Sequence, residues 1–298
     1  MCSFSNFPQK YVILGQFFIK TYHILCYFIL KERTSDAIII LLSEVVILKE
    51  QIYTIPVNEA YDTDCECPMC FLEKKLEREA LDYTLGAAMM EPDFRENSNR
   101  EGFCNHHFSM LFDMQNKLAL ALVLDTHLEE IRKSLDTLSK SAKALESAKG
   151  GLFKKTGAAE FATALSSQLD NISCGCVVCS KINHTMERYA DVLLYMWAKD
   201  EKFKEKFDKS KGLCLKHMKL LADTAPKSLN DSQAAQFLSA MFDKQKTELT
   251  RIQEDIHKFT LKFDYRNKDM EWGTAQDAPI RTIEKISGFI KNDIEPEK

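Results

Sequence analysis

The sequence predicts an all-α protein, an internally duplicated helical bundle with two metal-binding clusters of cysteine and histidine. Three observations lead to this prediction. Glycine and proline are scarce, at 10 and 7 of 298 residues, whereas helix-forming lysine, glutamate, leucine and alanine are abundant. Long segments carry apolar residues at helical intervals. One cysteine pattern also occurs twice, with the same order and nearly the same spacing.

The repeated pattern is CxCxxC followed by CxxH after a spacer of 33 or 34 residues. The first copy consists of Cys65, Cys67, Cys70, Cys104 and His107. The second copy consists of Cys174, Cys176, Cys179, Cys214 and His217. Cysteines scattered through a core would not repeat both spacing and order, so the pattern predicts two equivalent sites for a metal ion.

The pattern and the composition divide the chain into five parts. We expect an apolar extension at 1–47, a first metal-binding unit at 48–150, a linker helix at 151–173, a second metal-binding unit at 174–264, and a tail with a last helix at 265–298. In the first unit we expect a strand or strap at 51–57, then helices at 71–90 and 106–147 with a short polar turn or helix at 93–100. In the second unit and tail we expect helices at 182–197, 200–208, 217–223, 232–264 and 279–291, with an interruption at Pro226.

The extension at 1–47 is rich in phenylalanine, isoleucine, leucine and tyrosine. Its longest apolar run, 11–30, has the length of a membrane span but contains Lys20, which costs about 2.5–3.5 kcal/mol on insertion. Membrane contact is therefore expected only if 11–30 is a genuine anchor. A segment packed on the body is a second interpretation. A slightly favoured third is translated upstream sequence, with the natural start near Leu48.

Charge and leader signals indicate the compartment and the class of partner. The net charge of −4 disfavours a general nucleic-acid binder, which normally presents a basic face. The first residues lack the charged segment and the cleavage site of an export signal, and the paired cysteines are typical of reduced metal ligands. We therefore expect a cytoplasmic protein with an unknown protein partner.

Zinc is the metal that this pattern favours, because zinc takes four tetrahedral thiolate or imidazole ligands. The spacing predicts one site from Cys67, Cys70, Cys104 and His107. It predicts the other from Cys176, Cys179, Cys214 and His217. Two zinc ions per chain are therefore expected, each closed by four protein ligands, as in structural sites.

One cysteine in each copy is left over. Cys65 and Cys174 are additional ligands or redox thiols in this interpretation, and a site of four cysteines that uses Cys65 and omits His107 remains open. An iron–sulfur cluster also remains open, because each copy holds four cysteines. His106 is not expected to be a ligand, since Lys216 takes its place in the second copy.

Several segments resemble an uncharacterised bacterial family that is classed as a domain of unknown function. They are the run 49–60, the cluster Cys65-Glu-Cys67-Pro-Met-Cys70, Gly102-Phe-Cys104, and Met114-Gln-Asn. The resemblance extends from residue 49 to the C-terminus. Some members carry an automatic label of ABC-transporter substrate-binding protein, but the chain has no export signal or lipid-attachment cysteine that would support it. The resemblance implies no catalytic residues.

The function predicted from these observations is a zinc-binding binding or scaffold module with structural metal sites. Catalysis is disfavoured, because the chain contains no HxxEH, GxSxG or phosphate-binding loop. Two alternatives stay open. One is a redox or metal sensor that uses Cys65 and Cys174, and the other is an iron–sulfur protein.

Overall fold

A computed structural model describes residues 53–147 and 157–289 of the chain. All regular secondary structure in these two ranges is helical, which confirms the predicted fold class. Residues Thr54–Lys298 form one unit, and the described residues belong almost entirely to it. The interpretations of 1–47 fall outside the described residues and stay predictions. Within the described ranges, every helix is too short or too polar to cross a membrane.

The first described element is a helix at 53–62, where the sequence predicted a strand or strap at 51–57. The prediction was wrong because packing outweighs the preference of isolated residues for a strand. Val57, Ala60 and Tyr61 fall on one face of the helix and are buried. The Tyr61 ring contacts the rings of Phe203 and Phe207, with centroids 5.0 and 6.1 Å apart.

The predicted helix at 71–90 consists of two elements. Helix α3 runs from Pro68–Thr84, and the short 3₁₀ helix η1 covers Ala87–Met90. Helix α4 follows at Pro92–Glu101. Both α3 and α4 begin with proline, whose fixed φ angle suits the first position of a helix.

The predicted long helix at 106–147 is also divided. Helix α5 covers Asn105–Asp113, and α6 covers Lys117–Ser147. Asn116 separates them, because its side-chain oxygen accepts a hydrogen bond from the Ala119 N–H at 3.1 Å and so caps α6. The same side chain donates to the Leu85 carbonyl at 2.8 Å, which ties this corner to the end of α3.

The second half of the chain follows the predicted order of helices. Its elements are α7 Gly157–Cys174, α8 Val177–Lys199, α9 Glu201–Lys209, α10 Leu215–Ser228, α11 Asp231–Leu261 and α12 Ala278–Ser287, with two short 3₁₀ turns, η2 Tyr265–Asn267 and η3 Gly273–Ala275, between α11 and α12. Pro226 lies inside α10, so the expected interruption comes later, at Leu229.

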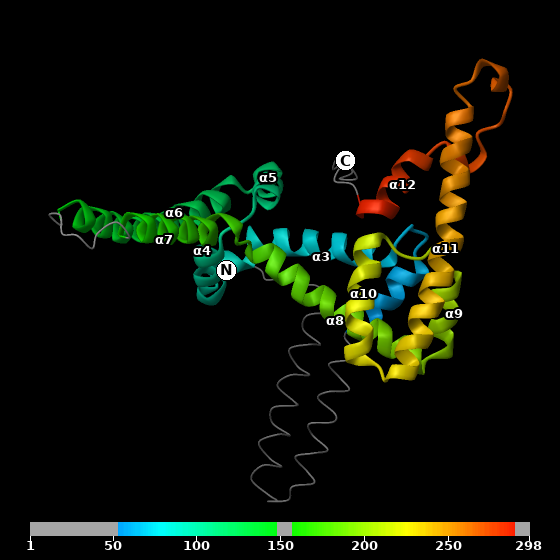
Figure 1. Cartoon of the computed structure of the whole chain (residues 1–298), viewed down its shortest axis with the longest axis horizontal. Helices are drawn as coiled ribbons and strands as arrows, with labels where there is room; N and C mark the ends of the chain where they lie inside the picture. Colours follow the sequence, from blue (N-terminus) through cyan, green and yellow to red (C-terminus); the bar gives the residue numbers. More distant parts are fainter. Residues whose placement is uncertain (1–52, 148–156, 290–298) are drawn as a thin grey trace, which may run out of the picture. The chain divides into compact units, whose positions relative to one another are not determined.

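Helix α8 organises the packing around the candidate sites. It packs against α3 and α10, as well as against α9 and α11 (Figure 1). Its side chains Ala190, Leu193 and Leu194 are fully buried. This arrangement lays α3, from the first half of the chain, beside helices of the second half.

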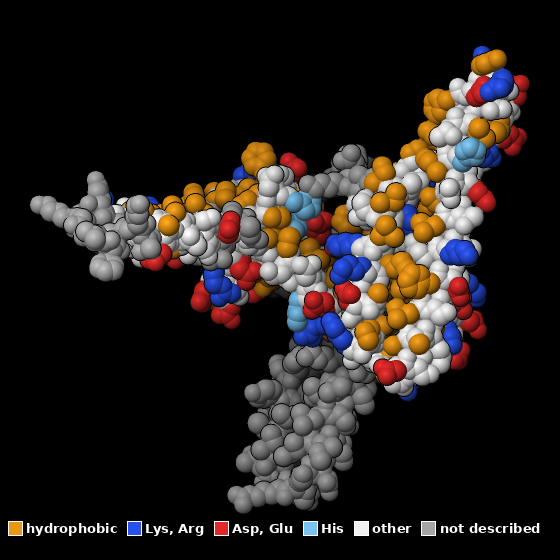
Figure 2. Space-filling view, viewed as in Figure 1, with side chains coloured by type: hydrophobic (Ala, Val, Ile, Leu, Met, Phe, Trp, Pro, Cys, Tyr) orange, Lys and Arg blue, Asp and Glu red, His pale blue; other side chains and the backbone are white. Residues whose placement is uncertain are grey.

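The long helices α6 and α11 leave apolar side chains on the surface. Leu118 of α6 is 72% exposed and Phe242 of α11 is 60% exposed. Figure 2 shows apolar side chains along the arm that contains α6 and α7 and on the face that α10 and α11 present. Helix α6 packs mainly against α4 and α7, whereas α11 packs mainly against α12 and α10.

Candidate metal sites

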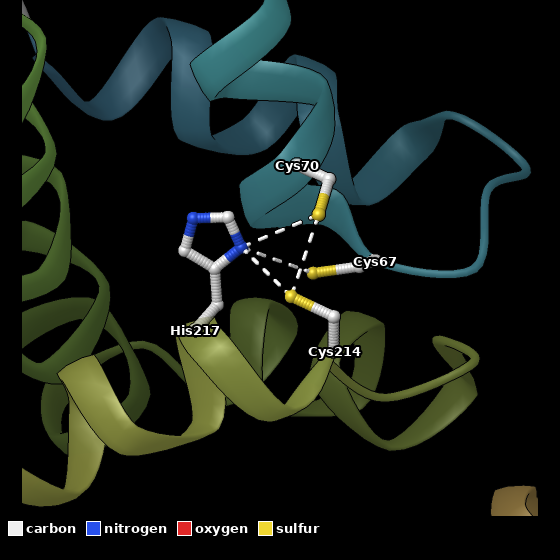
Figure 3. Close-up of side chains that lie close together, drawn as sticks. All are labelled: Cys67, Cys70, Cys214 and His217. Atoms are coloured by element: carbon white, nitrogen blue, oxygen red, sulfur yellow. Dashed lines mark hydrogen bonds between the residues drawn. The ribbon is translucent and has the colours of Figure 1, made fainter. Parts of the chain in front are cut away.

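The first candidate site lies between the starts of α3 and α10 (Figure 3). Cys67 is the residue that precedes α3, and Cys70 lies in its first turn. Cys214 and His217 occupy the same two positions at the start of α10. Residues three apart in a helix share a face, and a helix N-terminus favours a thiolate. We call this group the α3–α10 site.

Short distances connect the four side chains of the α3–α10 site. Nδ1 of His217 lies 3.2 Å from Cys214 Sγ, 3.4 Å from Cys70 Sγ and 3.5 Å from Cys67 Sγ. The sulfur atoms of Cys70 and Cys214 are 3.5 Å apart. All four residues are buried.

The second candidate site has the same construction at the starts of α5 and α8. Its members are Cys104, His107, Cys176 and Cys179. Nδ1 of His107 lies 3.2 Å from Cys104 Sγ, 3.1 Å from Cys176 Sγ and 3.4 Å from Cys179 Sγ. The sulfur atoms of Cys104 and Cys179 are 3.8 Å apart. We call this group the α5–α8 site.

These distances fit a tetrahedral zinc ion. Zn–S and Zn–N bonds of about 2.3 and 2.0 Å place two sulfur ligands about 3.8 Å apart, and a sulfur and a nitrogen ligand about 3.5 Å apart. A disulfide would instead bring two sulfur atoms to about 2.05 Å. Each site therefore has the ligand types, the number of ligands and the spacing that would hold one zinc ion.

The pairing of the two motifs corrects the sequence prediction. The eight predicted ligands do come together, but each CxxC meets the CxxH of the other copy. The physical reason is the length of α3, whose residues after Cys70 carry the chain about 21 Å away from it. Helix α5 then packs against α3 downstream of that start, where His107 reaches the side chain of Glu77. The chain therefore does not return to Cys67 and Cys70, as a site made within one copy of the motif would require.

The surplus residues lie outside both groups of four. Cys65 is half-buried and is not a member of either site. Burial, together with the nearby Cys67, raises the pKa of Cys65 to about 11. The side chain of Cys174 is outside the described part of the structure. His106 faces Glu77, with its Nε2 2.8 Å from Glu77 Oε1, and does not join the thiols.

Two carboxylates that the sequence analysis missed, buried Glu77 and half-buried Glu73, lie behind the histidines. Nε2 of His107 lies 3.1 Å from Glu77 Oε1, and Nε2 of His217 lies 3.4 Å from Glu73 Oε2. Burial alone would raise the pKa of both carboxyl groups. The contacts of Glu77 with His107 and His106, and those of Glu73 with His217 and Lys216, outweigh burial and lower both pKa values. The signal was available, because Glu73 and Glu77 follow Cys70 by three and seven residues on one helix face.

The same surroundings favour positive charge at the histidines. Burial lowers the pKa of His107, but the contacts with Cys176 and Glu77 raise it to about 10. Burial likewise lowers the pKa of His217, and the contacts with Cys214, Cys67 and Glu73 raise it to about 11. The sulfur atoms on one side of each ring and the carboxylate on the other therefore favour positive charge at this place, which a divalent metal ion would supply.

Comparison with known families adds one result. Residues 48–293 match a family of unknown function, DUF6062. The chain belongs to this family. The DUF6062 match contains all eight site residues as well as α12, and it confirms the predicted resemblance to an uncharacterised family. No curated protein and no solved structure matches the chain significantly.

In this DUF6062 protein, a buried lysine from α12 holds the two loops of the α3–α10 site together. Lys285 is 0% exposed and donates to the carbonyl oxygens of Glu66 and Lys211 at 2.6 and 2.5 Å. Its ammonium also lies 3.3 Å from the Glu66 carboxylate, which pairs with Arg251 as well. These carbonyls come just before the two ligand motifs, so Lys285 bridges the CxxC loop to the CxxH loop.

The α5–α8 site of the DUF6062 protein joins its loops without such a bridge. Gly175 occupies the position that matches Glu66, and a Cβ atom there would collide with the carbonyl oxygen of Glu101. The two loops thus touch directly, which only glycine permits. The α5–α8 site is also more exposed to solvent, because Cys104 and Cys179 are half-buried. In the α3–α10 site, Gly288, which directly follows α12, lies close to Cys70.

Replacing Lys285 is expected to destabilise this DUF6062 protein strongly. Lys285→Met removes a buried cation and leaves two carbonyl oxygens without their donor, while Glu66 keeps its pair with Arg251; the loss of such a buried partner typically costs about 3–5 kcal/mol. Denaturant unfolding of the zinc-loaded protein measures the effect. Lys209→Met is the matched control, because Lys209 is exposed and its loss should cost at most about 0.5 kcal/mol. Equal stability of the two variants would contradict the proposed clamp.

Proposed function

We propose that this protein is a zinc-binding helical module that holds two structural zinc ions per chain. The observation that carries the proposal is the pair of Cys₃His groups, both at tetrahedral spacing. Four protein ligands leave no open position for a substrate or an activated water, which is typical of structural zinc rather than catalytic zinc. A binding or scaffold role without catalysis follows from this closed coordination.

The exchanged pairing supports a specific structural role. One zinc ion joins α3 to α10, and the other joins α5 to α8, so each ion connects the first half of the chain to the second. The ions would thus hold the two halves in one arrangement and present a rigid surface to a protein partner. We propose the cytoplasm as the compartment, because thiolate ligands persist where cysteines stay reduced.

We also propose that the two halves arose by internal duplication. Each half places a CxxC at the start of one helix, α3 or α8, and a CxxH at the start of another, α5 or α10. A helix of 31 residues, α6 or α11, ends each half. In this arrangement the CxxC and the CxxH of one half lie in different sites. A single ancestral unit would therefore complete a site only by pairing with a second copy of itself.

The ligand sets support zinc over an iron–sulfur cluster. Such clusters prefer four cysteines, whereas each group gathers three cysteines and one histidine. The sensor alternative that uses Cys65 and Cys174 receives no support from Cys65, because Cys65 lies outside both groups of four.

Anaerobic purification with elemental analysis and a visible spectrum tests the proposed function. We expect about two zinc per chain and no visible absorption band, since zinc has a filled d shell. Iron with a brown colour would replace the proposal by an iron–sulfur protein. Protein without bound metal, after purification in the presence of zinc, would exclude both.

A further inference from the structure

The helix α3 contributes to both candidate sites, although it carries ligands of only one. Its start supplies Cys67 and Cys70 to the α3–α10 site. One turn further, Glu73 approaches His217 of that same site, and Glu77, another turn on, contacts His107 of the α5–α8 site. The exposed fractions of these glutamate side chains are only 13% and 9%.

Both histidines turn the same nitrogen toward the thiols. Nδ1 faces the sulfur atoms in each site, so Nε2 is left as the outer nitrogen that carries a proton when Nδ1 binds a metal. A carboxylate that accepts this outer N–H fixes the ring orientation and strengthens the histidine as a ligand. Glu77 Oε1 makes this contact with Nε2 of His107 at 3.1 Å, whereas Glu73 Oε2 faces Nε2 of His217 at 3.4 Å without forming a hydrogen bond.

The helix that matches α3 in the second half lacks these carboxylates. Helix α8 begins with Cys176 and Cys179, and the positions three and seven residues after Cys179 are Ile182 and Met186, both buried. His107 therefore receives its carboxylate from α3, even though its neighbouring CxxC comes from α8. The contact makes the α5–α8 site depend on how α3 is placed.

We propose that Glu77 is a positioning residue that couples the two sites, so that metal in the α3–α10 site strengthens metal binding in the α5–α8 site. A metal ion bound by Cys67 and Cys70 fixes the start of α3. It thereby fixes how far the helix is rotated about its own axis and where the helix lies along that axis. Glu77 lies on the same rigid helix two turns further on. Because coupling between two binding equilibria is reciprocal, metal at the α5–α8 site should strengthen the α3–α10 site by the same factor.

Site-resolved metal affinities of the full chain test the proposal, which rests on the proposed zinc sites. The protein is loaded with ¹¹³Cd to assign one resonance to each site, and zinc affinities are then measured by competition with a chelator. Glu77→Gln is expected to weaken the α5–α8 site about 10- to 100-fold and to shift its resonance. Glu73→Gln is the matched control, expected to act first on the α3–α10 site. His106→Lys, which copies Lys216, should change little.

The coupling itself is measured with a second pair of variants. Cys214→Ser removes metal from the α3–α10 site without altering α3, and we expect it to weaken zinc binding at the α5–α8 site at least about fivefold. In the Glu77→Gln background the same change should have a smaller effect. An equal effect in both backgrounds, or none in either, would overturn the coupling. Absence of metal from the wild-type chain would instead overturn the proposed function.

Discussion

A Cys70→Ser, Cys214→Ser double variant is expected to keep about one zinc per chain, whereas Cys70→Ser, Cys104→Ser is expected to lose both ions. The reason is the exchanged pairing of the motifs. Cys70 and Cys214 belong to one site, and their sulfur atoms are 3.5 Å apart. Cys104 belongs to the other site, together with the CxxC of α8.

The measurement is zinc content per folded chain after dialysis against a weak chelator. Cys104→Ser, Cys179→Ser serves as the matched control for the α5–α8 site, and it should also keep about one zinc. Pairing within each copy of the motif reverses the expected order. In that case Cys70→Ser, Cys104→Ser would keep one ion and Cys70→Ser, Cys214→Ser would lose both.

Removal of zinc by a strong chelator is expected to abolish the cooperative unfolding of the protein. Structural zinc contributes about 10–16 kcal/mol of apparent binding free energy in zinc-finger peptides at pH 7, which equals or exceeds the whole stability of most domains. The two sites connect α3 to α10 and α5 to α8, so their loss separates the two halves of the chain. Buried thiols and histidines would then lack the ion that compensates their burial.

Circular dichroism during thermal unfolding measures this effect, and zinc added back should restore the transition while magnesium should not.

The same experiment at lower pH gives the direction of the pH dependence. Zinc binds thiolate and neutral imidazole, so protons compete with the metal and stability should fall as the pH decreases. An unchanged unfolding transition after complete removal of zinc would contradict a structural role.

The helices themselves were largely predictable from the sequence. Apolar periodicity indicated the position of α11, and glycine before Cys104 and Cys214 marked the turns that begin α5 and α10. Gly102 and Gly212 have φ angles of 63° and 80°, a conformation that favours glycine. The division at Asn116 and the helix at 53–62 escaped prediction. The first depends on a side-chain cap, and the second on the contact between Tyr61 and rings from α9.

The sequence alone determined which side chains gather as candidate ligands. Two CxxC and two CxxH motifs have a local geometry that any helix start reproduces, so all eight residues were identified without the fold. Which motif meets which was decided only by tertiary structure. Helix α3 carries the chain away from the CxxC at its start. The CxxH that completes this site therefore comes from the helix that packs beside that start, which is α10. The same packing places Glu77 and Lys285 at the sites, since their partners are 30 and 219 residues away in the chain.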